Sequence, residues 1–221
     1  MKLALFTQHF PNYQSLADLA VPNHEEYCIR HGYQHIVHQG AYANPNWYYG
    51  FQKIQYILDL FYDPAKVGAT ESPDLVWSLN LPSVITNMTI PVTEYLQDSN
   101  ADFWITKDCH DINGGSLVVR KSEWSKRWLE FIIANEPIYK NHCWFEQKVM
   151  IDHWQNPEWK SRISILHQRL INSYVYQLYP PWNSGTIGDW RRGDLVLSFP
   201  GTNLEQRLKL VEETLRNRVI P

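Results

Sequence analysis

Short apolar runs alternate with amphipathic segments along this chain, and this alternation constrains the fold more than any other feature. Residues 3–7 and 74–79 are mainly apolar runs of strand length, and residues 34–38 are expected as a further strand. Residues 47–62 repeat apolar side chains at helical spacing. Further elements are expected as strands at residues 103–106, 116–120 and 195–199, and as helices after Ser122, at residues 145–154 and from 203 to about 218. The alternation predicts an α/β fold with a central, mostly parallel mixed sheet flanked by helices.

Local capping signals predict where several helices begin and end. Asn23 opens a sequence that resembles a capping box and Gly32 is a C-terminal stop, so we expect a helix over residues 23–31. Ser122 and Asn203 are expected to cap two later helices in the same way.

The composition excludes several classes of protein. The 221 residues suffice for one domain with a sizeable core, and the formal net charge of −3 lacks the basic excess of a nucleic-acid binder. Three cysteines without a CxxC pair do not form a disulfide framework. Because no apolar run reaches 18 residues, we expect a soluble protein with no membrane span, by default in the cytoplasm.

Familiar catalytic motifs are missing, so the fold must indicate where ligands bind. The sequence has no GxxxxGK[ST], GxGxxG, GxSxG or HExxH pattern. In open α/β sheets, ligands bind beyond the carboxyl ends of the strands. We therefore expect the site at the loops after Thr7, Leu79 and Phe199.

Two groups of metal-binding residue types occur, and neither has favourable spacing. A helix-breaking glycine stands between His31 and His35, so the two do not share a helix face. His35 and His38 would lie on opposite faces of a strand. Cys109-His110 and His142-Cys143 could form a Cys2His2 zinc site, but adjacent residues rarely ligate one ion. We favour structural roles for both groups and keep zinc as an alternative.

Polar residues precede a glycine pair in the middle of the chain. Asp108, Asp111 and Asn113 stand directly before Gly114-Gly115, which open an apolar strand. Paired glycines permit close approach of a ligand, and acids and amides hold sugar hydroxyls. The alternative is an Asx turn that leads into a hairpin.

The same segment resembles a family signature. Residues 113–125 (NGGSLVVRKSEWS) are similar to the pattern Asn-x-Gly, apolar strand, Arg-Asn-Ser-x-Trp-Ser of a retaining glycosyltransferase family. That family contains plant xyloglucan xylosyltransferases, galactomannan galactosyltransferases and yeast Golgi mannosyltransferases, and transferases of large algal (chlorella) viruses that glycosylate capsids are also similar. Five other pieces follow in the family's order: Tyr27-Cys28 with 31–33, Trp47 with Lys53, 74–87, Glu146-Gln147, and Gly193-Asp194 with 199–201.

The resemblance implies a fold and an activity. It implies a single GT-A, Rossmann-like domain over residues 1–221, with a nucleotide-binding half at about 1–110 and a donor-sugar and acceptor half at about 111–221. The implied reaction transfers a sugar from a nucleotide-sugar donor, such as a UDP-sugar, to a glycan or glycoprotein acceptor with retention. The leaving phosphate would accept the acceptor's proton, so the protein would supply positioning and charge stabilisation.

Site residues are carried over by their match to the family's motifs. Gln147 would lie under the anomeric carbon with Glu146 beside it, as the catalytic pair. Asp111 and Asn113 would hold the donor sugar. The residues expected to bind the nucleotide and donor are Thr7, Gln8, Tyr13, Lys53, Leu79, Asn80, Leu81, Gly114 and Arg191.

The expected metal ligands are replaced in this chain. Asn80-Leu81-Pro82 stands where the family has Asp-x-Asp, and Ser198 stands where it has a histidine. Mn²⁺ and Mg²⁺ prefer carboxylate oxygens, so we expect the need for a divalent cation to have weakened. Positive charge for the diphosphate would then come from Lys53, Arg120 or Arg191-Arg192. Alternatively, Asn80, backbone groups and water still hold a cation.

Two rival functions and an acceptor surface remain open. The chain could be a catalytically degenerate module that binds sugar nucleotides or glycans, or a protein scaffold with an aromatic surface. The 10 tryptophans, 13 tyrosines and 8 phenylalanines favour sugar or nucleotide binding only weakly, because aromatic rings also fill cores. Residues 179–190 have the composition of a lid or acceptor loop. An acceptor platform could involve the tryptophans Trp144, Trp154, Trp182 and Trp190.

Overall fold

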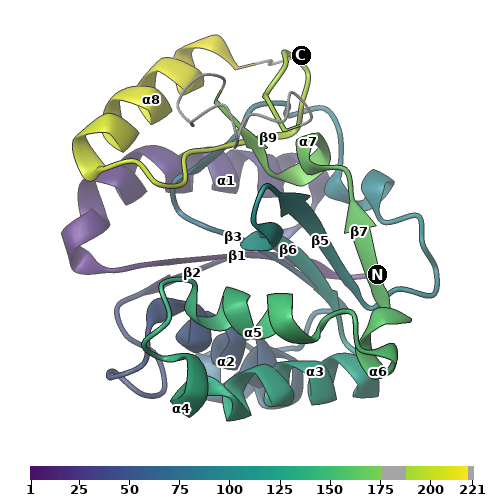
Figure 1. Ribbon diagram of the computed structural model, residues 1–221. Coiled ribbons are helices and arrows are strands. Elements are labelled where there is room, and N and C mark those ends of the chain that lie inside the picture. Colours follow the sequence, from purple (N-terminus) through teal and green to yellow (C-terminus); the bar gives the residue numbers. More distant parts are fainter. Residues whose placement is uncertain (176–187, 219–221) are drawn as a thin grey trace.

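The computed structural model describes residues 1–175 and 188–218. They form three layers, in which a six-stranded sheet lies between two layers of helices (Figure 1). The strand order is β2-β1-β3-β6-β5-β7, and β6 alone among the strands of this sheet in the described residues runs antiparallel to its neighbours. The strands of this sheet are β1 (Leu3–His9), β2 (Gln34–Gln39), β3 (Leu75–Leu79), β5 (Phe103–Asp108), β6 (Asp111–Arg120) and β7 (Ile163–Leu166). The predicted mixed α/β fold is confirmed.

Helices cover both faces of the sheet (Figure 1). On one face lie α1 (Gln14–His31) and α8 (Leu204–Asn217), and on the other lie α2 (Tyr49–Tyr62), α3 (Glu123–Ala134) and α5 (Phe145–His153). The shorter helices are α4 (Glu136–Tyr139), α6 (Pro157–Lys160), α7 (Gln168–Ile171) and the 3-10 turns η1 (Pro11–Tyr13), η2 (Pro64–Val67) and η3 (Val92–Tyr95). No helix in the described ranges has the length and apolar character needed to cross a bilayer.

A second, three-stranded sheet packs beside the carboxyl end of β3. Its order is β4-β9-β8, from β4 (Ser83–Ile85), β9 (Val196–Ser198) and β8 (Ser173–Tyr174). Because β4 follows β3 after only a few residues, this sheet brings the late strands β8 and β9 to the edge of the sheet where ligands are expected.

Tryptophan packing accounts for much of the aromatic content. Trp124, Trp128, Trp154 and Trp159 are all buried in the core between the sheet and the helices α2, α3 and α5. The side chain of Trp154 is only 7% exposed, so its expected role in an acceptor platform is wrong. Trp182 and most of the proposed lid lie outside the described residues.

The expected start of the first helix is also wrong. Helix α1 begins at Gln14 and continues through Pro22, and Asn23 does not cap it. Instead, the buried amide of Asn23 donates to the carbonyl of Ile85 and accepts from its N–H, at 3.0 and 2.8 Å. The side chain that resembled a local cap therefore forms tertiary hydrogen bonds to β4. The helix continues through Pro22 because burial of its inner face outweighs the backbone hydrogen bond that proline cannot donate.

Candidate active site

A bulge in β6 forms the centre of the candidate site. The register against β5 passes from Ile105–Leu117 to Thr106–Asn113, so residues 114–116 leave the pairing with β5. The carbonyl of Gly115 accepts from the backbone N–H of Asn80 at 2.9 Å, which joins the bulge to the end of β3. A Cβ atom on Gly115 would lie 2.9 Å from Asn113 Oδ1, so this close approach requires glycine. Bulges of this kind often occur beside active sites.

A buried lysine binds the bulge from α2. The side chain of Lys53 is 3% exposed, and its Nζ donates to the carbonyl of Gly114 at 2.8 Å. The same Nζ lies 3.4 Å from Glu146 Oε1 and 3.5 Å from Asn80 Oδ1. A buried charge is costly unless it is paired and hydrogen-bonded, and these contacts supply both conditions.

The partner carboxylate of Glu146 lies over the first turn of α2. A Cβ atom on Gly50 would overlap the Glu146 carboxylate, so glycine at this position leaves the space that the carboxylate occupies. The N-terminal end of a helix favours a negative charge, so both Lys53 and the start of α2 stabilise the anion. Burial, followed by the charge of Glu146, raises the pKa of the neighbouring Tyr49 far above its usual value. Sequence reasoning missed Gly50, and no local pattern marks it.

Gln147 connects α5 to the bulge. Its Oε1 accepts from the backbone N–H of Gly114 at 3.0 Å, which leaves the Nε2 group to donate to a ligand. The structure therefore places Gln147, Glu146, Lys53 and Asn80 around Gly114, as one cluster drawn from α5, α2, β6 and the end of β3.

A network of amides and a tyrosine fixes the start of β6. Asn113 Oδ1 accepts from the N–H of Gly115 at 2.8 Å and from Asn172 at 3.1 Å, while its Nδ2 donates to Asp108 at 2.8 Å. Tyr174 also donates to Asp108, at 2.8 Å. Both polar atoms of Asn113 thus have protein partners, so it holds the bulge in place. Asn172 and Tyr174 were not predicted, because only the fold brings them beside β6.

Asp111 lies outside this cluster, at the hairpin turn. Its Oδ1 accepts from the N–H of Ile112 at 2.9 Å and pairs with Lys107 at 3.0 Å. Residues 108–111 form the turn of the β5–β6 hairpin, with Asp108 opposite Asp111 and the N–H of His110 donating to Asp108. The Asx turn, offered as the alternative from the sequence, is therefore present.

The end of β1 forms another side of the same edge. Phe6 pairs with Ser78, so Gln8 and Asn80 lie equally far along neighbouring strands. Gln8 donates from Nε2 to the carbonyl of Gly40 at 3.0 Å, and its buried Oε1 has no partner among the described residues. Tyr13 follows at the end of η1 and is half-buried.

Thr7 faces the interior and does not face a ligand. Its side chain is 0% exposed, and its hydroxyl lies 3.1 Å from Nδ1 of the buried His24. His24 Nε2 must donate to the carbonyl of Ser83, 2.9 Å away, so Nδ1 accepts from Thr7. Burial lowers the pKa of His24 to about 4. The side chains of Leu79 and Leu81 are also buried, so only their backbone could contact a donor.

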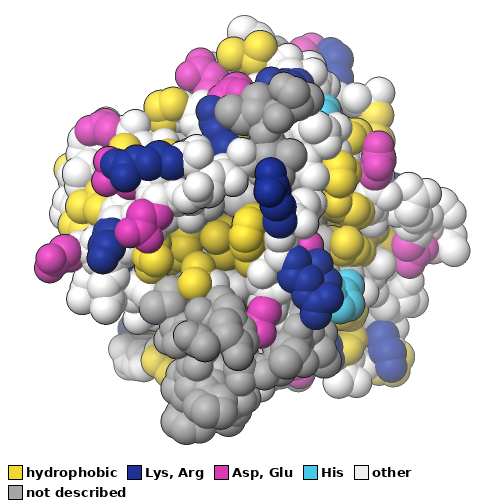
Figure 2. Space-filling view, turned by 90° about the horizontal axis from the view of Figure 1, so that it is seen from above, with side chains coloured by type: hydrophobic (Ala, Val, Ile, Leu, Met, Phe, Trp, Pro, Cys, Tyr) yellow, Lys and Arg dark blue, Asp and Glu magenta, His cyan; other side chains and the backbone are white. Residues whose placement is uncertain are grey.

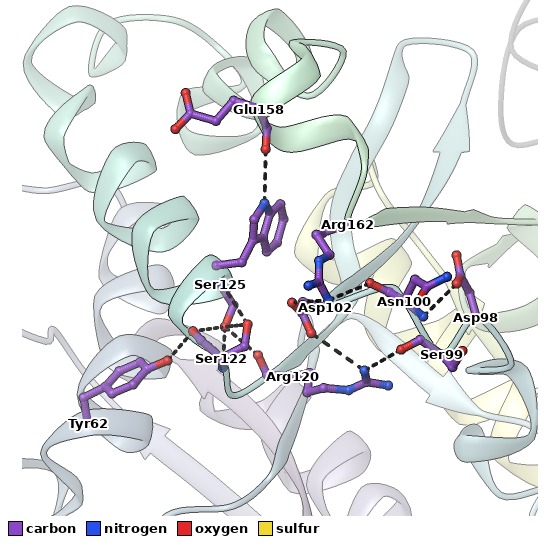
Figure 3. Close-up of polar contacts among 11 residues, drawn as sticks. Tyr62, Asp98, Ser99, Asn100, Asp102, Arg120, Ser122, Ser125, Glu158 and Arg162 are labelled. Atoms are coloured by element: carbon purple, nitrogen blue, oxygen red, sulfur yellow. Dashed lines mark hydrogen bonds and ion pairs between the residues drawn. The ribbon is translucent and has the colours of Figure 1, made fainter.

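Arg120 lies at the opposite end of β6 from the bulge, so its expected role beside a diphosphate is wrong. Its Nη1 donates to the carbonyl of Ser99 at 3.0 Å and lies 3.7 Å from Asp102, which Arg162 also approaches. Figure 3 shows these residues together. In the same view the Ser122 and Ser125 side chains form the capping box that begins α3. This half of the resembling motif is structural.

The remaining candidates lie around the small sheet. Arg191 and Arg192 are exposed on a turn in which Asp194 accepts from the N–H of Arg191 and binds Arg169 at 2.7 and 2.9 Å. Ser198 is buried, and its Oγ lies 2.9 Å from Ser83 Oγ.

Trp190 and α8 border a hollow of about 230 Å³. Charged and hydrophobic side chains are mixed on the face of the molecule that Figure 2 shows. The indole N–H of Trp190 donates to Thr86 at 3.0 Å, so this ring is held in the wall of the hollow. Trp190 thus lies against the small sheet and α8.

No cluster suited to zinc is present among the residues that the structure describes. His31 lies against the carbonyl of Met88 at 3.0 Å, and no group of three or more His, Cys, Asp or Glu side chains converges within the described ranges. The histidines of the two Cys-His pairs both lie near the ring of Trp144, which is 4.9 Å from the ring of His110 and 5.6 Å from that of His142.

Solved structures with the same fold are glycosyltransferases. One involved in the glycosylation of the major capsid of PBCV-1 is 19% identical, with a TM-score of 0.73 over 96% of this chain and 100% of that chain. GlyE of Streptococcus pneumoniae is 14% identical, with a TM-score of 0.57 over 100% of this chain and 61% of its own. A mutant of the Drosophila β-1,4-galactosyltransferase 7, in complex with manganese, UDP-Gal and xylobiose, is 11% identical, with a TM-score of 0.50. The match covers 93% of this chain and 73% of that chain.

Two yeast proteins are similar in sequence. An uncharacterized α-1,2-galactosyltransferase of Schizosaccharomyces pombe is 22% identical over 87% of this chain and 65% of its own length. The probable α-1,6-mannosyltransferase MNN10 of Saccharomyces cerevisiae is 33% identical over 38% of this chain and 22% of its own. The chain thus spans less than two thirds of the length of either relative. Residues 74–209, more than half of the chain, match the galactosyl transferase GMA12/MNN10 family. The chain therefore belongs to this glycosyltransferase family and has the GT-A fold.

Proposed function

We propose that this chain transfers a sugar from a UDP-sugar to a glycan or glycoprotein acceptor, with retention of the anomeric configuration. The carrying observation is the buried ammonium of Lys53, which lies at the carboxyl edge of the sheet beside Asn80 and Gly114. Nucleotide sugars bind at this edge in open α/β folds. The manganese and UDP-Gal of the Drosophila structure support the same class of donor.

We further propose that this site works without a resident divalent cation. The side chains at the family's ligand positions do not fit one, because Asn80 offers an amide and the hydroxyl of Ser198 is engaged with Ser83. In addition, Lys53 Nζ lies 3.5 Å from Asn80 Oδ1. Two unit charges of like sign at about 4 Å repel by about 4 kcal/mol at an effective dielectric constant of 20, and a divalent ion would be repelled more.

Lys53 would replace the charge that a metal supplies in related sites. Among the described residues, only the Gly114 carbonyl accepts from its Nζ at a short distance, while Asn80 and Glu146 lie at 3.4 Å or more. The ammonium can therefore turn a donor toward a diphosphate oxygen and stabilise the leaving group as the bond to the sugar breaks.

Gln147 and the bulge would position the sugar. With its Oε1 held by Gly114, the Nε2 group of Gln147 has a fixed direction and can donate to a sugar hydroxyl or to the departing oxygen. The network around Asn113 holds the bulge rigid, which keeps these groups in place during transfer. The departing phosphate would take the proton of the acceptor hydroxyl.

A nucleotide screen followed by a transfer assay tests the proposal. We expect UDP to raise the melting temperature more than GDP or CMP does, with or without Mn²⁺. Release of UDP from UDP-galactose, UDP-glucose or UDP-xylose should persist in EDTA, and NMR of the transfer product should show the anomer of the donor. Loss of activity in EDTA with rescue by Mn²⁺ would contradict the metal-free site.

One observation favours a second function. Asn80-Leu81-Pro82 in place of an acidic pair is also what a degenerate binding module would contain. UDP binding without turnover of any tested UDP-sugar would favour that function. A protein that binds none of the nucleotides would be neither.

A further inference from the structure

Three loops meet at the N-terminus of α5, immediately beside the candidate site. Residues 40–48 contribute Tyr48, whose ring is nearly parallel to that of Phe145, with an interplanar angle of 12°. The hairpin turn contributes His110, and residues 141–144 contribute His142 and Trp144. The centre of the Trp144 ring lies 4.9 Å from that of His110 and 5.6 Å from that of His142, and both imidazoles are tilted against it.

Backbone strain is concentrated on these loops. Among the described residues, the non-glycine residues with positive φ are Ala43 (58°), Asp111 (91°) and Phe145 (42°). Ala43 and Asp111 belong to two of these segments, and Phe145 directly follows the third. Such conformations cost about 1–3 kcal/mol each and cluster at functional sites, where neighbouring structure holds them. Asp111 and Phe145 are next to His110 and Trp144 in sequence, so strain adjoins the aromatic cluster on two sides.

The rings of this cluster are accessible, unlike the tryptophans of the core. Tyr48 is 38% exposed, His110 is exposed and Trp144 is half-buried. Hydrogen bonds fix the backbone of Trp144, because its N–H donates to His142 Nδ1 at 3.1 Å and its carbonyl accepts from the N–H of Gln147 at 2.9 Å. Trp144 thus belongs to the turn that begins α5, three residues before Gln147.

Charges of both signs border the cluster. Lys107 forms an ion pair with Asp111 at 3.0 Å, and its Nζ also lies 4.2 Å from the centre of the Trp154 ring. Burial raises the pKa of Tyr48, the negative charge of Glu146 adds to that rise, and the positive charge of Arg207 opposes it less strongly. The rim therefore offers imidazole and carboxylate hydrogen-bonding groups without a dominant positive charge to recruit an anionic ligand. Aromatic faces with polar groups at the rim fit the C–H face and the hydroxyls of a neutral pyranose.

We propose that Trp144, His110 and Tyr48 form the subsite for a neutral terminal pyranose of the acceptor, a role that rests on the proposed sugar transfer. The subsite adjoins Gln147 through the backbone of Trp144, so a sugar stacked there lies on the solvent side of the Gln147 cluster. The donor enters from the edge that contains Lys53 and Asn80. The two sugars would then meet at Gln147, which is the arrangement that transfer requires.

Direct binding to the indole group tests this subsite. The side-chain N–H signals of the tryptophans are recorded by ¹⁵N NMR in the presence of UDP, and the Trp144 signal is assigned by its loss in Trp144→Phe. The probes are methyl β-galactopyranoside, methyl α-mannopyranoside, methyl β-glucopyranoside and methyl β-xylopyranoside. We expect at least one to shift the Trp144 signal, and galactose 6-sulfate to shift it less.

Matched variants locate the effect. Trp144→Ala should weaken binding of the active glycoside about 10-fold, whereas Trp144→Phe keeps a stacking face and should weaken it only about 2- to 3-fold. Trp190→Phe, beside α8, should leave the affinity unchanged. A melting-temperature rise with UDP shows that each variant is folded.

The outcomes separate the two proposals. If UDP binds but no glycoside shifts the Trp144 signal, or if Trp190→Phe weakens binding as much as Trp144→Ala does, the acceptor subsite is wrong and the proposed donor site stands. If UDP itself does not bind, the proposed function fails instead. An equal response to galactose 6-sulfate would overturn the preference for a neutral sugar.

Discussion

The two ends of strand β6 contain polar clusters of opposite character. At the Gly114 end, Lys53 and Glu146 are almost wholly buried, the strand bulges and glycine is required. At the Arg120 end, the arginines that approach Asp102 are partly exposed and a capping box begins α3. One sequence segment, residues 113–125, spans both ends. A resembling motif can therefore identify a family while only part of it contributes to the site.

The difference between the ends is energetic as well as geometric. At the Arg120 end the carboxylate of Asp102 is buried, but both arginines are partly exposed and keep part of their hydration. Burying Lys53 and Glu146 costs several kcal/mol in lost hydration, which their mutual contact offsets only in good geometry. A chain gains little stability from such a pair, so its presence at the Gly114 end points to function.

Replacing Lys53 should have the largest effect. We expect Lys53→Met to lower the transfer rate at least about 100-fold, because it removes the charge that would stabilise the leaving diphosphate. It should also lower the free energy of unfolding by about 3 kcal/mol, because Glu146 is left buried without its cation. Steady-state kinetics measures kcat/KM, and denaturant titration measures the free energy of unfolding. The double variant Lys53→Met/Glu146→Gln should regain stability but not transfer activity. If Lys53→Met alone kept wild-type activity, the functional distinction between the two ends of β6 would be wrong.

Acid should weaken the site edge through His24, which supports the end of β1. The pKa of His24 is lowered from 6.5 to about 4, because burial disfavours the charged ring. The unfolded chain therefore binds a proton at a pH where the folded chain does not, so this contribution to stability is complete above about pH 6.5 and is lost as the pH falls to about 4. The shift corresponds to about 3 kcal/mol.

Denaturant titration of the wild type and of His24→Gln at pH 7, 5 and 4 measures that loss. The variant should lose less stability between pH 7 and pH 4 than the wild type does, by about 3 kcal/mol. Its absolute stability at pH 7 is not the readout, because the bonds to Thr7 and Ser83 also change. Parallel pH curves for the two proteins would show that His24 is not the responsible group.

Removing the Gln147 side chain should have an intermediate effect on catalysis. We expect Gln147→Ala to reduce transfer at least about 10-fold while UDP affinity stays nearly unchanged, because the interaction is made mainly in the transition state. Steady-state kinetics and UDP titration measure the two quantities. Full activity in the variant would place Gln147 with the structural residues.

The smallest effect is expected at the Arg120 end. Ser122→Ala removes the cap of α3 and should lower the free energy of unfolding by about 1 kcal/mol, with no change in transfer. Ser122→Asn can still accept from the helix N–H groups and should retain most of the stability. A large loss of transfer in the alanine variant would show that the two ends of β6 are coupled.

The sequence by itself determined the order of the long helices and of most strands in the main sheet, because apolar periodicity records which face of each segment is buried. It did not indicate the short strands β4, β7 and β8. It did locate α3 and α8 through Ser122 and Asn203, whose capping bonds span only three residues. The same local rule failed at Asn23, where a tertiary partner in β4 took the side chain.

Only the tertiary structure decided which polar residues meet. Thr7 and Arg120 belong to the predicted strands, yet one faces the core and the other lies at the far end of β6. Gly50, Asn172 and Tyr174 reach the site from distant segments. Periodicity predicts whether a side chain is buried. Its partners depend on strand register, on the bulge in β6 and on the crossing of α2 with α5, and packing of the whole chain sets all three.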